Sequence, residues 1–199
     1  ETKCNRGSYD EPIAIHALER FVADHASHLP KKIEKISPQR EGKIAIVGSG
    51  PAGMSCAYHL ARLHYHVTVF ESLPLAGGLL RMGIPSYRLP KEILDREISA
   101  IEALGVEIRT GVPMGEEIRM EELKDYQATF IATGAHLSRR LNIPGEKGRG
   151  VFSGLDLLKR INLGNKVKMG DRVAVIGGGN TAIDVARSVV RLGKKATIL

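Results

Sequence analysis

The amino-acid sequence predicts an α/β fold, in which parallel β-strands alternate with α-helices. Two short apolar strands, over residues 43–47 and 172–176, each lead into a glycine-rich turn and then into a helical pattern. The two segments align through strand, turn, helix and second strand, 129 residues apart from Gly48 to Gly177. Apolar residues make up 43% of the chain, which is enough to form a core. These observations predict two related βαβ units in one folded chain.

The N-terminal residues predict a helical segment followed by a linker. From Asp10 onward, apolar residues recur at helical spacing, and Asp10 and Pro12 are typical of a helix start. Pro30 would end this helix, and the polar residues that follow it have no apolar period. We therefore expect residues 1–29 to be the last part of an N-terminal helical region, and residues 30–42 to form a linker.

The first βαβ unit opens a domain that we expect over residues 43–150. Its elements are a strand over 43–47, a turn over 48–53, a helix to about His64 and a strand over 66–70 that ends at Glu71. Glycine-rich turns and prolines occupy 74–90, and the alternative to a functional segment there is an irregular surface loop. The further elements of this domain are a helix over 92–104 and strands over 106–109 and 128–131.

The second βαβ unit belongs to a domain that we expect over residues 151–199. Its elements are a helix over 154–162, a strand over 172–176, a turn over 177–182, a helix to about Leu192 and a strand from Ala196. The last residue falls inside that strand, so the sequence predicts a truncated second domain.

The first turn, Gly-Ser-Gly-Pro-Ala-Gly, has the pattern of a Rossmann-type dinucleotide-binding turn. Gly48 permits the tight bend out of the strand, Gly50 lets the backbone approach a pyrophosphate, and Gly53 lets helix and strand pack closely. The pyrophosphate would lie at the helix N-terminus, where free N–H groups favour anions, and Pro51 suits the first helical turn. The same glycines can form a sharp turn that binds no ligand, but the flanking strands and helix favour a nucleotide site.

The acidic residue after the second strand and the second glycine-rich turn refine this interpretation. Glu71 lies 18 residues after Gly53, where a carboxylate can accept hydrogen bonds from a ribose diol. Because it would repel a 2′-phosphate, the first site should hold FAD or NAD rather than NADP. The second turn keeps Gly177 and Gly179, and its third position is Ala182, which still permits close packing. The residue that would distinguish NADPH from NADH lies beyond the last residue, so that choice stays open.

Composition and charge argue against several other classes of protein. The net charge of +7 comes from scattered basic residues that never alternate with aromatic ones, so we expect no nucleic-acid partner. The chain has no run of eighteen apolar residues and no signal peptide, which predicts no membrane partner and a cytoplasmic location. Cys4 and Cys56 form no Cys-x-x-Cys pair, so we expect neither a disulfide framework nor a redox-active disulfide.

The order of several motifs resembles one family of oxidoreductases. Besides the turns GSGPAG and GGGNTAID, the chain contains LAGGLLRMGIP at 75–85, YRLPK at 87–91 and ATGA at 132–135. In this order they resemble the small (beta) subunit of NADPH-dependent glutamate synthase and related FAD/NAD(P)H oxidoreductases, over essentially the whole chain, as a fragment lacking both ends. The resemblance implies a Rossmann-like FAD-binding domain with an N-terminal helical segment and the start of a second Rossmann-like NAD(P)H-binding domain.

The resemblance also implies which residues bind the cofactors, and it implies no catalytic acid or base. The FAD pyrophosphate would be held by Gly48, Ser49, Gly50, Pro51, Ala52 and Gly53. The adenosine ribose would meet Glu71 and Ser72, and the adenine would meet the backbone of Val112. The flavin would lie along Gly78, Leu79 and Arg88, under Ala132, Thr133 and Gly134. The NADPH pyrophosphate would be held by Gly177, Gly179, Asn180, Thr181 and Ala182. Without the resemblance, Arg88 would be interpreted as a solvated charge.

The implied activity is hydride transfer from NAD(P)H to FAD, followed by electron delivery to an iron–sulfur centre or a larger catalytic partner subunit. In the resembling family, an N-terminal helical region binds iron–sulfur clusters, and the pattern Cys4-x-Arg6-Gly7 resembles its end. A 4Fe-4S cluster usually needs four thiolates, so Cys4 could be a ligand only in a longer protein and is otherwise a free thiol.

Two other functions stay open at this point. One is a ferredoxin- or adrenodoxin-reductase-like electron-transfer flavoprotein, and the other is a non-catalytic nucleotide-binding module. In flavoproteins with two dinucleotide-binding domains, the chain that follows the second domain supplies part of the flavin site. We therefore expect the fragment to be weakly active or inactive alone.

Overall fold

The computed structural model describes residues 1–26, 33–115, 121–138 and 140–199. The chain divides into two units. The first unit is Glu1–Ile33 and the second is Glu34–Leu199. The predicted end of the N-terminal helix, near Leu29 and Pro30, lies outside the described residues. The linker over 30–42 and the domain boundary at residue 150 stay predictions.

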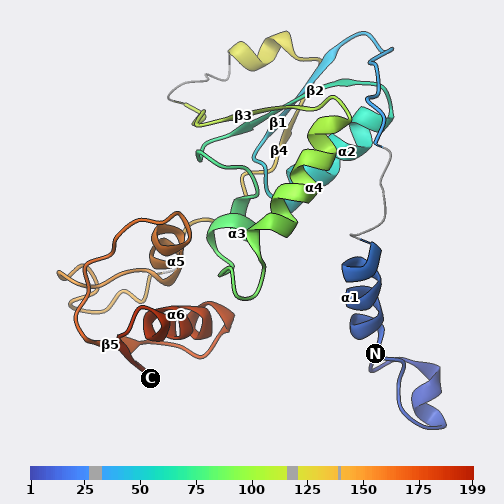
Figure 1. Ribbon diagram of the computed structural model, residues 1–199. Coiled ribbons are helices and arrows are strands. Elements are labelled where there is room, and N and C mark those ends of the chain that lie inside the picture. Colours follow the sequence, from blue (N-terminus) through green and yellow to red (C-terminus); the bar gives the residue numbers. More distant parts are fainter. Residues whose placement is uncertain (27–32, 116–120, 139) are drawn as a thin grey trace. The chain divides into compact units, whose positions relative to one another are not determined.

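In the first unit, the amphipathic helix begins later than the sequence predicted. Helix α1 spans Ile15–Ala26, and a short 3-10 helix, η1, spans Asn5–Ser8 (Figure 1). Asp10 does not begin α1, because its carboxylate accepts two hydrogen bonds from the Arg6 guanidinium, at 2.8 and 2.5 Å. The Asp10 side chain therefore closes the turn after η1 and does not cap the helix.

A parallel sheet of four strands, in the order β3-β2-β1-β4, forms the first half of the second unit (Figure 1). The strands are β1 (Lys43–Val47), β2 (His66–Glu71), β3 (Glu107–Thr110) and β4 (Ala128–Ile131). Strand β1 pairs with both β2 and β4, and its apolar residues are buried. These strands confirm the predicted ones to within one residue at each end.

Helices α2 (Pro51–Arg62) and α4 (Lys91–Ala103) complete the core of this half. Helix α2 packs on β1 and β2, and α4 packs against α2. Ile46, Ala57 and Val69 are fully buried between the sheet and α2. A short 3-10 helix, η2 (Glu122–Asp125), precedes β4. The carboxyl ends of β1, β2 and β4 meet at one edge of the sheet, where the first glycine-rich turn begins.

The segment over 74–90, for which the sequence predicted turns, contains one short helix. Helix α3 (Gly78–Met82) forms inside it. Gly77 and Gly78 both have positive φ, of 121° and 54°, and this conformation costs glycine little. The two glycines therefore turn the chain into α3, close to the glycine-rich turn after β1.

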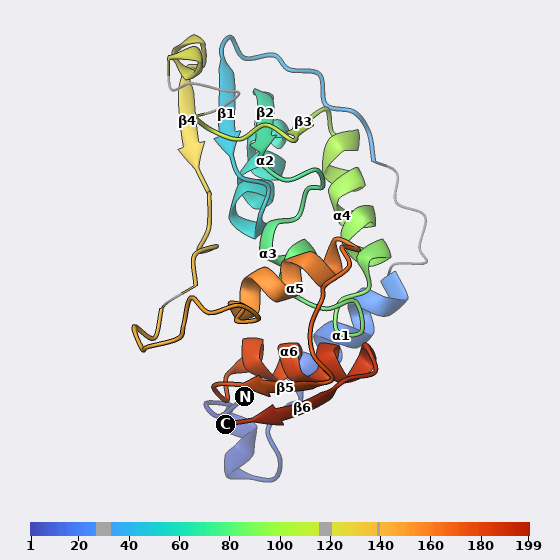
Figure 2. The ribbon, with the colours of Figure 1, turned by 90° about the vertical axis from the view of Figure 1, so that its left-hand side faces the viewer.

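The second half of this unit repeats the βαβ pattern. Its elements are α5 (Gly154–Asn162), β5 (Arg172–Val175), α6 (Asn180–Arg191) and β6 (Lys195–Ile198). Strands β5 and β6 are parallel, α6 packs on both of them, and α5 packs on α6 (Figure 2). Leu158, Val185 and Val189 are the buried centre of this second core. The predicted α/β fold with two βαβ units is confirmed.

Candidate functional site

The glycine-rich turn after β1 is packed too closely for side chains at two of its positions. A Cβ at Gly53 would lie 1.9 Å from the Gly48 carbonyl oxygen. A Cβ at Gly48, where φ is 106°, would lie 2.2 Å from the Ala132 carbonyl oxygen. In contrast, a Cβ at Gly50 would meet no atom within 4 Å. Two glycines therefore serve the packing of the turn, and Gly50 leaves space above the N-terminus of α2.

A buried hydrogen-bond network connects this turn to the end of β2. Glu71 is 4% exposed, and its Oε2 accepts from the Ser49 backbone N–H at 3.1 Å and from the Ser49 hydroxyl at 2.5 Å. Its Oε1 accepts from the Leu73 N–H at 2.8 Å and from the Ser72 hydroxyl at 3.3 Å. The Ser49 Oγ in turn accepts from the Gly77 N–H at 3.0 Å. One hydroxyl therefore joins the turn, the end of β2 and the entry into α3.

We expect Ser49→Ala to lower the free energy of unfolding by about 1–3 kcal/mol, the cost of leaving buried polar groups without partners. The substitution removes the donor to Glu71 and the acceptor of Gly77, at a side chain that is completely buried. Urea denaturation measures the loss. Ser55→Ala, at an exposed position of α2, is the matched control. An equal effect of the two substitutions would contradict the structural role of the Ser49 hydroxyl.

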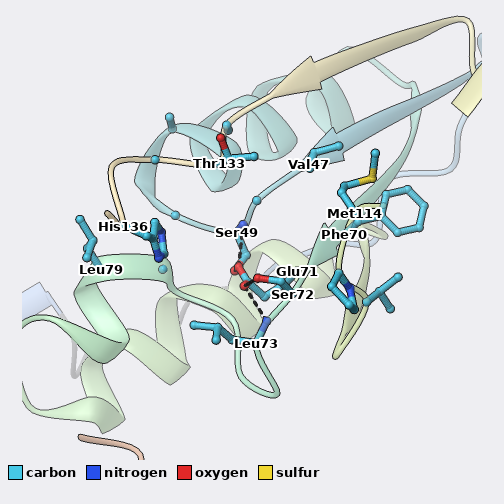
Figure 3. Close-up of a pocket in the computed structure, with 18 of the residues that line it drawn as sticks. Val47, Ser49, Phe70, Glu71, Ser72, Leu73, Leu79, Met114, Thr133 and His136 are labelled. Atoms are coloured by element: carbon cyan, nitrogen blue, oxygen red, sulfur yellow. Dashed lines mark hydrogen bonds between the residues drawn. The ribbon is translucent and has the colours of Figure 1, made fainter. Parts of the chain in front are cut away.

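A cavity of about 520 Å³ opens at this edge of the sheet. Phe70 and Met114 lie at one end, Leu79 and His136 lie at the other, and Ser49 lies between them (Figure 3). The lining residues are Val47, Gly48, Ser49, Gly50, Pro51, Ala52, Phe70, Glu71, Ser72, Leu73, Gly78, Leu79, Val112, Pro113, Met114, Ala132, Thr133, Gly134, His136 and Lys159. The cavity is within the size range of small-molecule and cofactor sites.

The structure brings most of the predicted FAD-site residues together around this cavity. Those that line it are Gly48, Ser49, Gly50, Pro51, Ala52, Glu71, Ser72, Gly78, Leu79, Val112, Ala132, Thr133 and Gly134. Gly53 is buried behind the turn, where it serves packing. The sequence interpretation missed Val47, Phe70, Leu73, Pro113, Met114, His136 and Lys159. Most of these adjoin predicted residues in the chain, but Lys159 has no neighbouring signal.

Arg88, which the family resemblance implied along the flavin, forms an ion pair with a residue of α6, and its contact with the flavin stays a prediction. It is absent from the cavity lining, and its guanidinium donates to the Asp184 carboxylate at 2.6 Å. Asp184 lies in α6 and is 5% exposed. The Tyr87 hydroxyl is 3.4 Å from both the backbone oxygen and the carboxylate of Asp184. In this structure, Arg88 therefore joins the two halves of the second unit.

The second glycine-rich turn is more open than the first. Gly177 has a φ of 113°, and a Cβ there would lie 3.9 Å from the Ala182 Cβ. A Cβ at Gly179 would meet no atom within 4 Å. Asn180, Thr181 and Ala182 form the first turn of α6. The predicted NADPH-site residues are therefore gathered at one helix N-terminus.

Cys4 and Cys56 are both free thiols. Backbone hydrogen bonds, first that of Ile13 and then that of Arg6, lower the pKa of the Cys4 thiol. Burial raises the pKa of the Cys56 thiol, which packs against the first core.

Among the described residues, no group of three or more His, Cys, Asp or Glu could hold a metal ion. In the same part of the chain, no helix is both long and apolar enough to cross a membrane.

Known proteins are similar to this chain over nearly its whole length. It is 44% identical to the NADP(+)-dependent formate dehydrogenase subunit beta of Moorella thermoacetica, over 98% of this chain and 31% of that protein. It is 33% identical to the glutamate synthase [NADPH] small chain of Escherichia coli (strain K12), over 98% of this chain and 44% of that protein. The predicted resemblance to the glutamate synthase small subunit is therefore confirmed, although the chain spans less than half the length of these relatives.

Solved structures and a family profile agree with these relatives. Mycobacterium tuberculosis FprA in complex with NADPH is similar, with a TM-score of 0.64 and 34% identity, over 74% of this chain and 36% of that one. The profile described as pyridine nucleotide-disulphide oxidoreductase matches residues 42–199, which include both βαβ units and the cavity. The chain belongs to the pyridine nucleotide-disulphide oxidoreductase family.

Proposed function

We propose that this chain is the FAD- and NAD(P)H-binding part of a flavoprotein oxidoreductase. Hydride would pass from NAD(P)H to FAD, and electrons would pass on to an iron–sulfur centre or a larger partner subunit. The observation that carries the proposal is the elongated cavity at the carboxyl edge of the parallel sheet, lined by the first glycine-rich turn and Glu71. Ligands of open α/β sheets bind at this edge.

The geometry of the first turn fits a dinucleotide. The open space at Gly50 lets the backbone approach a phosphate group closely, and the free N–H groups at the start of α2 favour an anion there. The clashes that side chains would meet at Gly48 and Gly53 explain why the turn needs glycine at the other two positions. The network of Ser49 and Glu71 holds the turn in this form.

The two ends of the cavity fit the two halves of FAD. Phe70, Val112 and Met114 form an apolar end suited to the adenine, next to Glu71 and Ser72 for the ribose. Leu79 and His136 line the opposite end, where the flavin would lie (Figure 3). When bound, FAD supplies the hydride acceptor and the electron donor, and the protein holds and shields it.

The nicotinamide and the partner are proposed from the second turn and the relatives. The open turn at Gly177 and Gly179 would hold the NAD(P)H pyrophosphate. NADPH is favoured over NADH, because the formate dehydrogenase relative is named for NADP(+) and FprA was solved with NADPH. The relatives are named as a subunit and a small chain, which supports a larger catalytic subunit or iron–sulfur acceptor as partner. A 4Fe-4S cluster at Cys4 is proposed only for a longer protein, and the cytoplasm is the proposed location.

FAD loading followed by anaerobic reduction tests this proposal. The chain is incubated with FAD, separated from free cofactor and mixed with NADPH without oxygen. We expect FAD to remain with the protein and its oxidised absorption band to fade slowly on addition of NADPH, because the chain alone is expected to be only weakly active. Riboflavin is the control, because it lacks the ADP half that the turn and Glu71 would recognise, and we expect it to be lost on separation. A protein that stays colourless after incubation with FAD would refute the proposal.

A further inference from the structure

A lysine from the second half lines the cavity of the first half. Lys159 lies in α5, whereas all other lining residues lie between Val47 and His136. Among the described lining residues, Lys159 is the one lysine or arginine, and Glu71 is the one acidic residue. The side chain is partly buried. The position of this cation in the cavity lining suggests that it interacts with a negatively charged group of the ligand.

The Lys159 ammonium has no partner among the residues that the structure describes. The acid on its own helix, Asp156, accepts from Arg160 at 2.9 Å. A lysine ammonium carries three donors and a full charge, which an anion in the cavity could use. Within the described part of the chain, no ion pair of Lys159 has to be broken for such an anion to bind.

Helix α5 is held against the cavity by a contact one turn after Lys159. The Asn162 side-chain amide donates to the Met82 carbonyl at 2.7 Å and is 3.4 Å from the Ile84 carbonyl. Residues three apart lie on the same side of a helix, so Lys159 and Asn162 share the side that faces α3. Helix α3 abuts the first turn, because a Cβ at Gly78 would lie 2.8 Å from the Gly50 Cα. Two successive contacts therefore connect α5 to the pyrophosphate-binding turn.

We propose that Lys159 binds the pyrophosphate of the cofactor in this cavity, which makes the second half of the unit part of the FAD site. The inference rests on the proposed function, because it takes FAD as the occupant. The phosphates are the charged groups of oxidised FAD, so an ammonium in the cavity gains most from them. The α2 N-terminus offers only about half a positive charge, whereas the pyrophosphate is dianionic and Glu71 adds a further negative charge.

Binding of ADP and FAD to matched variants of the chain tests this assignment. Lys159→Gln removes the charge and keeps a side chain of similar size. We expect it to lower the affinity for both ADP and FAD about tenfold at low salt. The difference should shrink in high salt, because screening weakens the interaction between ammonium and phosphate. Lys159→Arg keeps the charge and should restore most of the affinity. Lys166→Gln removes an exposed lysine that does not line the cavity, and it should bind both ligands as the original chain does.

The outcomes separate this inference from the proposed function. If the original chain binds FAD, and Lys159→Gln binds both FAD and ADP as tightly as the original chain does, the role of Lys159 is refuted and the proposed function stands. If Lys159→Gln weakens FAD and leaves ADP unchanged, Lys159 does not bind the pyrophosphate, and the assignment is refuted. If the original chain binds no FAD, both proposals fail. Circular dichroism of each variant shows whether the fold is intact, and Lys159→Met, which also removes the charge and keeps the aliphatic stem, supplies the test if Lys159→Gln is unfolded.

Discussion

Replacement of Gly53 by alanine is expected to destabilise the chain by about 3 kcal/mol and to abolish retention of FAD. The new methyl group would lie 1.9 Å from the Gly48 carbonyl oxygen and 3.1 Å from its carbonyl carbon. Both are backbone atoms, which no change of side-chain rotamer can move away. Helix α2 would have to shift away from β1, and the turn between them would lose its shape. Urea denaturation and FAD retention after gel filtration measure the two effects.

Gly50→Ala is the matched control in the same turn. Gly50 has a φ of −68°, and a Cβ there would meet no protein atom within 4 Å. We expect this variant to fold and to lose about 1 kcal/mol of stability, because the methyl group meets no protein atom and alanine is a poorer N-cap than glycine. Its FAD affinity should fall, because the methyl group occupies the space of the pyrophosphate. If Gly53→Ala kept both stability and FAD, close packing of helix and strand would not be what this glycine provides.

The second turn shows why alanine is tolerated at the equivalent position there. Ala182 corresponds to Gly53, and a Cβ built on Gly177 would lie 3.9 Å from the Ala182 Cβ, which is an ordinary contact distance. Helix and strand in the second half therefore leave room for one methyl group. The expected loss at Gly53 reflects the tighter packing of the first half and is not a general property of such turns.

The strands and most helices could be predicted because their signals are local. Apolar runs and the glycine pattern lie within a few residues of the elements they specify. Helix α3 was missed, because glycines and prolines on both sides of it favour a loop by composition. The later start of α1 was missed, because Asp10 pairs backward with Arg6 although its residue type is typical of a helix cap.

The candidate site was predictable where its residues follow the ends of strands. Gly48 and Ala132 come directly after β1 and β4, Glu71 is the last residue of β2, and parallel strands bring those ends together. Lys159 and the partner of Arg88 could not be found in this way. They depend on how the two halves pack, and the Arg88–Asp184 pair spans 96 residues of chain. No local pattern encodes a contact of that separation.

The Arg88–Asp184 ion pair gives the second large effect, a loss of about 2–4 kcal/mol on Arg88→Met. The Asp184 side chain is 7% exposed and that of Arg88 is 43% exposed, so the charge left behind would be the buried one. Its remaining described donor is the Tyr87 hydroxyl, at 3.4 Å. The range lies below that of a fully buried pair, because water reaches the Arg88 side. Urea denaturation measures the loss.

Asp184→Asn should cost less than Arg88→Met, about 1–2 kcal/mol, because it leaves no buried charge and its amide oxygen can still accept from Arg88. Arg160→Met is the control, since Arg160 and Asp156 form a half-exposed pair within one helix, which should contribute less than about 1 kcal/mol. Arg88 joins the loop before α4 to α6, so its loss should also separate the two halves, which limited proteolysis between residues 140 and 153 would detect. If Arg88→Met and Arg160→Met had equal effects, the Asp184 carboxylate would be solvated, and the ion pair would not be what fixes the two halves together.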